Sequence, residues 1–153
     1  MATTYSNQKQ KWDQNSPKEM IKPNEMYGRM RVAFADVTMA GLAVGPVEMF
    51  NLPNGARILE GTLVHTAMGG STTISVGHAA YTDSSGATVA LDVDEYKAAA
   101  ASTTAQSVAV AATIALGKNS VVDADEDGIL ITVVTGGATL TGTIMLAMEY
   151  VVD

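Results

Sequence analysis

One acidic run in the chain has the spacing of a metal-binding loop. Residues 123–128 read Asp-Ala-Asp-Glu-Asp-Gly, and alternate carboxylates followed by glycine form the first half of a calcium loop of the D-x-D-x-D-G type. The twelfth position of such a loop is a bidentate glutamate, whereas this chain has Val134 there. Asp123, Asp125 and Asp127 are therefore candidate Ca²⁺ ligands, and a plain acidic turn is the alternative.

The other residues that could do chemistry lack a supporting motif. His65 and His78 lie on separate predicted strands, so we expect structural or surface imidazoles. The acids at 92, 94 and 95 lie at the start of a predicted helix, where carboxylates cap the first turn and interact favourably with the helix dipole. The chain has no cysteine, nucleophile elbow, zinc-binding helix or phosphate loop. We predict no catalytic residue, no cofactor apart from the candidate Ca²⁺, and no enzyme activity.

The single tryptophan lies in a polar N-terminal segment that has no core to bury it. Aromatic residues flanked by cations concentrate binding energy at interfaces. We therefore predict that residues 1–29 form an extended docking arm. The alternatives are that Trp12 packs back on its own domain or on a neighbouring subunit, or that it is a surface residue without a binding role. The arm residues expected to contact a partner are Tyr5, Lys9, Lys11, Trp12, Lys18, Lys22, Arg29 and Arg31.

Charge divides the chain at nearly the same point. Residues 1–31 carry six cations and three anions, a balance of +3, while the remainder carries three cations and thirteen acids, a balance of −10. Such an acidic body cannot follow a track of phosphates, so we expect no nucleic-acid partner. No apolar run is long enough to span a membrane, and no secretory signal is readable. Pro17 and Pro23 bias the arm away from helix.

Beyond Gly28, short β-prone runs alternate with turn signals at the spacing typical of a β-sandwich or a β-barrel. A chain of 153 residues that is 47% hydrophobic can build one such core. We predict an all-β sandwich domain over residues 30–153, a hairpin turn at Leu52 to Ala56, and one short helix from Asp92 to Ala101. The eight predicted strands cover about residues 30–38, 46–52, 56–68, 72–79, 87–91, 107–114, 128–135 and 139–151.

Two of these strands are apolar on both faces. In the last strand, Ile144 and Leu146 alternate with Met145 and Ala147. A half-solvated sheet has a polar second face, so either a loop or the arm of the same chain covers it, or another copy of the protein does. The residues assigned to an interface between copies are Leu130, Val134, Met145, Ala147 and Val151.

Four segments of the chain resemble segments of known proteins. The strand from Val32 to Thr38, the turn phrase from Phe50 to Leu59, the strand from Ile74 to Gly77 and the closing strand from Leu140 to Val151 resemble small virion proteins of tailed bacteriophages, above all head decoration (cement) proteins. The resemblance covers most of residues 30–153.

This resemblance implies jelly-roll subunits on the capsid exterior, as homotrimers in preference to homodimers, that tie neighbouring major capsid proteins together. It also implies synthesis in the bacterial cytoplasm, and it carries over no catalytic residue. A tail, tail-tube or head-fibre component is the structural alternative. A calcium-dependent carbohydrate-binding jelly roll is less favoured, because the body has no tryptophan to stack on a sugar.

Overall fold

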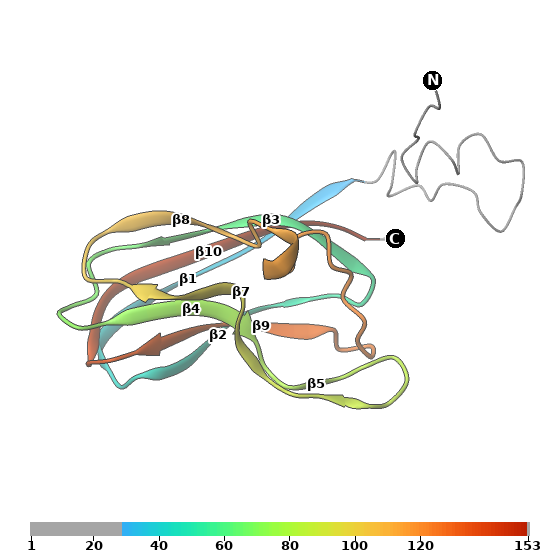
Figure 1. The fold of residues 1–153 in the computed structure, drawn as a ribbon, viewed down its shortest axis with the longest axis horizontal. Coiled ribbons are helices and arrows are strands. Elements are labelled where there is room, and N and C mark those ends of the chain that lie inside the picture. Colours follow the sequence, from blue (N-terminus) through green and yellow to red (C-terminus); the bar gives the residue numbers. More distant parts are fainter. Residues whose placement is uncertain (1–28, 153) are drawn as a thin grey trace, which may run out of the picture.

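Two four-stranded antiparallel sheets lie face to face in the computed structural model, which describes residues 29–152 (Figure 1). Sheet A contains, in order, β1 (Met30–Leu42), β10 (Leu140–Val152), β3 (Ala56–His65) and β8 (Gln106–Val110). Sheet B contains β2 (Gly45–Leu52), β9 (Ile129–Gly136), β4 (Thr73–His78) and β7 (Asp92–Ala101). A small hairpin pairs β5 (Tyr81–Thr82) with β6 (Thr88–Val89), and a 3₁₀ turn, η1, covers Ile114–Leu116.

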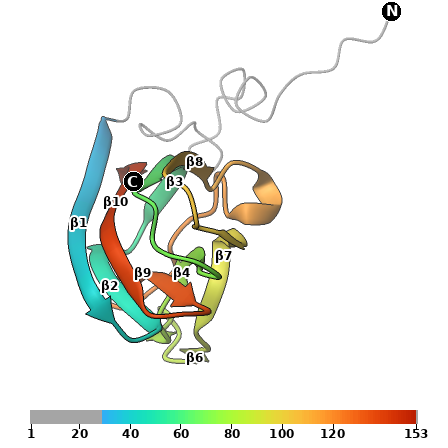
Figure 2. The ribbon, with the colours of Figure 1, turned by 90° about the vertical axis from the view of Figure 1, so that its left-hand side faces the viewer.

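The order of the strands identifies the topology. The chain passes from one sheet to the other at nearly every connection, and β4 and β7 are the only consecutive main strands that share a sheet. The orders β1-β10-β3-β8 and β2-β9-β4-β7 are those of a jelly roll. Figure 2 shows the two layers nearly end-on, with β1 and β2 along one side. The predicted all-β sandwich is confirmed.

The core lies between the sheets and follows the predicted alternation. Ile144, Leu146 and Met148 of β10 point inward and are fully buried, as are Ile131 and Val133 of β9. Full burial of one such side chain contributes roughly 1.5–3 kcal/mol. One face of each central strand therefore holds the two sheets together.

The turn at Leu52 to Ala56 has the expected geometry but a different role. The amide of Ala56 donates to the carbonyl of Pro53 at 3.1 Å, and Gly55 has a φ of +76°. However, β2 and β3 belong to different sheets. The predicted hairpin is wrong because the turn carries the chain from sheet B to sheet A.

The predicted helix from Asp92 to Ala101 is also wrong, since this segment is strand β7. The amide of Asp94 donates to the carboxylate of Asp92 at 3.0 Å, so the aspartate closes a local turn rather than a helix. The alanine run pairs with β4 through Ala100 opposite Ile74, and sheet pairing overrides the helix propensity of alanine. No helix within residues 29–152 has the length and apolarity needed to cross a membrane.

Candidate interaction surfaces

The acidic run forms a turn that is held by hydrogen bonds from its own backbone amides. The amide of Asp127 donates to the carboxylate of Asp125 at 3.1 Å, and the amide of Gly128 donates to the carbonyl of Asp125 at 3.1 Å. Gly128 has a φ of +72°, and a Cβ there would meet the carbonyl of Leu52. In residues 29–152 no three acidic, histidine or cysteine side chains gather around a possible metal position, so Asp123, Asp125 and Asp127 do not converge. The backbone alone explains the glycine of this motif.

The two histidines have structural surroundings. His65 and His78 are both buried, and Nδ1 of each lies 2.8 Å from the carbonyl oxygen of the next residue. The ring of His78 also stands edge-on to Tyr81, with 5.3 Å between ring centroids. These contacts agree with the structural imidazoles predicted from the sequence.

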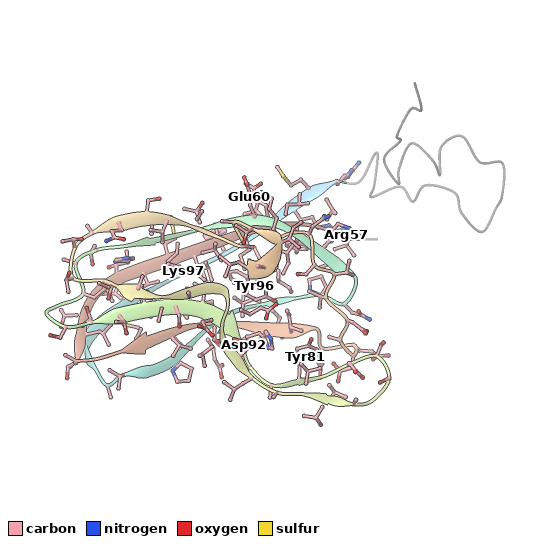
Figure 3. The ribbon with its side chains drawn as sticks, viewed as in Figure 1. Arg57, Glu60, Tyr81, Asp92, Tyr96 and Lys97 are labelled. Atoms are coloured by element: carbon pink, nitrogen blue, oxygen red, sulfur yellow. The ribbon has the colours of Figure 1, made fainter. Side chains whose placement is uncertain are left out.

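The buried polar groups of β7 serve the fold as well. Nζ of Lys97 donates to the carbonyl of Ala98 at 3.0 Å and to that of Ile74 at 3.4 Å, and burial lowers its pKa. Tyr96 is 4% exposed, and burial raises the pKa of its hydroxyl above the ordinary value. Figure 3 shows Asp92, Tyr96 and Lys97 along this strand. Lys97, through the carbonyl of Ile74, and the buried Tyr96 fix β7 against the rest of the sandwich.

The outer face of sheet A carries exposed apolar side chains in register across three strands. Phe34 of β1 lies opposite Ala147 of β10, and Met145 of β10 lies between β1 and β3. Phe34 is 70% exposed, Val32 55% and Met145 40%. We call this surface the open face. It consists of Val32, Phe34, Asp36, Glu60, Thr62, Val64, Met145, Ala147 and Glu149.

Two shallow grooves border the open face. One has a volume of about 480 Å³ and lies where Val64 and Met145 meet Ser107 of β8. The other, of about 510 Å³, lies where Glu60 and Glu149 meet the loop that contains η1. Its lining includes Ile114, which is 85% exposed, and Lys118, whose Nζ lies 3.6 Å from the Glu60 carboxylate. Glu60 lies on the sheet A side of the molecule in Figure 3.

The outer face of sheet B is covered by the chain itself over β4 and the middle of β9. A Cβ at Gly77 would meet the backbone of Asp92 and Val93, so the start of β7 lies directly over β4. The hydroxyl of Ser75 donates to the carbonyl of Val93 at 2.8 Å, and Thr132, opposite Gly77 on β9, is buried. Among the described residues of sheet B, the one exposed large apolar side chain is Val93 of β7, which is 40% exposed.

The five residues assigned to an interface between copies do not form one surface. Met145 and Ala147 belong to the open face, whereas Leu130 and Val134 lie half-buried on the outer side of sheet B. Val151 is 6% exposed and so is buried within its own chain.

The residues assigned to the arm lie mostly outside the described range. Arg29 and Arg31 are exposed at the start of β1, and the remaining six fall within residues 1–28. Sequence reasoning missed Val32 and Phe34. They alternate with Ala33 and Ala35 on β1, so apolar residues on both faces of this strand were the available signal.

No protein-family model matches the chain, and no curated protein matches it. Solved structures do. A chain in the capsid asymmetric unit of cyanophage Pam1 is 19% identical with a TM-score of 0.61, over 92% of this chain and 99% of the other. A chain in the capsid of Ralstonia phage GP4 is 22% identical with a TM-score of 0.59, over 82% and 86% of the two chains.

A third similar chain comes from the acid-stable capsid structure of Helicobacter pylori bacteriophage KHP30. It is 15% identical with a TM-score of 0.51, over 80% of this chain and 87% of the other. The three likenesses show a shared fold that spans most of each chain. The resemblance to phage virion proteins noted from the sequence is thus confirmed at the level of the fold.

Proposed function

We propose that this protein is a structural component of a phage virion that decorates the outside of the head and stabilises contacts between major capsid proteins. The observation that carries the proposal is the jelly roll shared with chains of three phage capsid structures, at nearly full length in the case of cyanophage Pam1. The sequence resemblance to head decoration proteins points the same way. The acidic turn and the buried histidines serve the fold, so they support no enzymatic role.

The division of charge fits a subunit that grips a lattice. The acidic body carries the stable fold, and the basic segment before it supplies docking contacts to the major capsid protein and across subunit boundaries. Such contacts are individually weak. On a repeating shell, a subunit of a homotrimer that is already held by one site meets the next site at high effective concentration. A small protein can therefore bind a head firmly without a large single interface.

The proposal is tested by adding the full-length protein to purified heads that lack it and sedimenting the mixture. We expect saturable binding to heads, no binding to isolated tails, and heads that keep their DNA at a higher temperature. The paired charge reversals Lys9→Glu and Lys11→Glu should weaken binding, and weakening by added salt should be smaller for this variant. Binding to tails but not to heads would contradict a decoration role and favour a tail component.

A further inference from the structure

We propose that the open face of sheet A is the docking site for the N-terminal segment of a second copy of this chain, with Trp12 seated against Phe34. This inference rests on the proposed function, because it says how the basic segment crosses a subunit boundary. Its occupant is residues 1–12, which contain Lys9, Lys11 and Trp12.

The open face has the properties of a surface that is covered in the working protein. Val32 and Phe34 are exposed on β1, and Met145, which lies opposite Asp36, is exposed on the adjacent strand β10. Clustered apolar side chains on a soluble protein mark contacts rather than ordinary surface. A segment bound to the open face can place its side chains in the two grooves at the edges of this face.

The charge of the face selects the kind of occupant. Asp36, Glu60 and Glu149 interrupt the apolar rows, and the nearby Lys118 already lies at Glu60. Two open faces packed against each other would bring acids toward acids, so the body of a second copy is a poor partner. A cationic segment with an aromatic anchor complements both the apolar rows and the acids.

Residues 1–12 match this description. They include two lysines and no acidic residue, and Lys9 and Lys11 lie within three positions of the only tryptophan. An indole buries a large apolar area, and each neighbouring ammonium can pair with a carboxylate at the edge of the face. The remaining charges of the chain's first part, by contrast, are of mixed sign.

The length of the segment favours a second copy over the same chain. Eighteen positions separate Trp12 from Met30, and their extended length is roughly 60 Å. The stretch from Val32 to Asp36 spans only about 13 Å. The start of β1 belongs to the open face, since Val32 lies opposite Glu149. Fully extended, the stretch between Trp12 and Met30 is several times longer than the open face, so it can carry Trp12 past the open face of its own chain to that of a neighbour.

The test uses the fluorescence of Trp12 in the full-length protein, since no other tryptophan contributes. In the unmodified protein we expect emission at shorter wavelength and several-fold weaker acrylamide quenching than in the denatured chain. Phe34→Glu should shift the emission toward that of the denatured chain. The matched control is Leu91→Glu, because Leu91 is 60% exposed but lies outside the open face, and it should change nothing.

A mixing experiment separates the two copies. One partner is Trp12→Phe, which keeps an intact open face and has no tryptophan, and the other is Phe34→Glu, which keeps Trp12 and has a damaged face. If the segment docks on a second copy, mixing moves the Trp12 emission back to shorter wavelength and the change saturates with added partner. The Phe34→Glu protein should keep the circular dichroism spectrum of the unmodified protein. If it does not, Glu149→Lys takes its place.

Three results would overturn the inference. Trp12 emission as exposed to water as in the denatured chain, or emission unaffected by Phe34→Glu, would show that the open face does not hold Trp12. Loss of burial in Phe34→Glu without recovery on mixing would show that the segment docks on its own chain. None of these measurements uses phage heads. The decoration role is therefore tested separately, by sedimentation with purified heads.

Discussion

The outer faces of the two sheets differ in what covers them. On sheet B, the start of β7 lies over Gly77, and the hydroxyl of Ser75 bonds to the backbone of Val93. On sheet A, Phe34 and Met145 remain exposed. The same jelly roll therefore covers part of one outer face with its own chain and leaves large apolar side chains exposed on the other. We infer that the covered face contributes to the stability of the subunit, whereas the open face serves its assembly.

The difference arises from the connection between β4 and β7. This connection contains the β5–β6 hairpin, and the chain returns from it across β4 before it pairs regularly as β7. Sheet A has no equivalent crossing among residues 29–152, because its strands are joined by segments that leave for sheet B. Substitutions on the two sheets should therefore differ in their effect on the stability of the subunit.

Gly77→Ala should cause the largest loss of stability. A Cβ at this position would lie 2.6 Å from the carbonyl carbon of Val93, and backbone cannot move aside as a side chain does. We expect the free energy of unfolding to fall by about 3 kcal/mol, measured by urea denaturation. Gly70→Ala is the control, because open space surrounds Gly70. Equal effects at the two glycines would show that β7 does not cover β4.

Ser75→Ala should have a smaller effect, again on stability. It removes the 2.8 Å hydrogen bond to the carbonyl of Val93 and leaves that acceptor without its partner. We expect a loss of about 1–1.5 kcal/mol in thermal or urea unfolding. Ser107→Ala, on the exposed outer side of sheet A, should be neutral. A neutral Ser75→Ala would mean that this bond does not hold the covering segment.

Tyr96→Phe should change the response of stability to alkaline pH. Burial raises the folded-state pKa of Tyr96 above the ordinary value of 10.0, so above that pH the unfolded chain loses this proton first. Stability then falls as pH rises, by at most about 1.4 kcal/mol per pH unit from this group. The phenylalanine variant should show a shallower decline in unfolding measurements between pH 9 and pH 11, taken as about one unit on either side of that ordinary value. An identical slope would contradict the burial of this hydroxyl.

Phe34→Ser should have the smallest effect on the isolated subunit. The side chain is 70% exposed, so its loss should change the free energy of unfolding by less than about 0.5 kcal/mol. A stability loss of the size expected for Gly77→Ala would show that Phe34 belongs to the subunit's own core and that the two faces do not differ as described.

Much of the sandwich followed from the sequence because alternation is a local signal. The pattern of Ile144, Leu146 and Met148 predicts β10 and the inward side of its first part, but the register shift after Glu149 turns Val151 into the subunit. The segment from Asp92 to Ala101 is predicted as a helix because an aspartate followed by an alanine run is typical of one. Pairing with β4, which the local sequence does not show, makes it a strand. Whether the outer face of a strand is covered depends on the rest of the fold. The sequences of β10 and β9 alone therefore could not show that Met145 is exposed whereas Thr132 is buried.

The central claim is tested most directly by electron cryomicroscopy of the intact virion at a resolution that traces strands. The account predicts jelly rolls on the outer surface of the head, at contacts between major capsid proteins, with protein density covering Phe34 on the open face. Jelly rolls inside the shell or confined to the tail would contradict the decoration role. Subunits on the head with the outer side of sheet A bare to solvent would contradict the assembly role of that face.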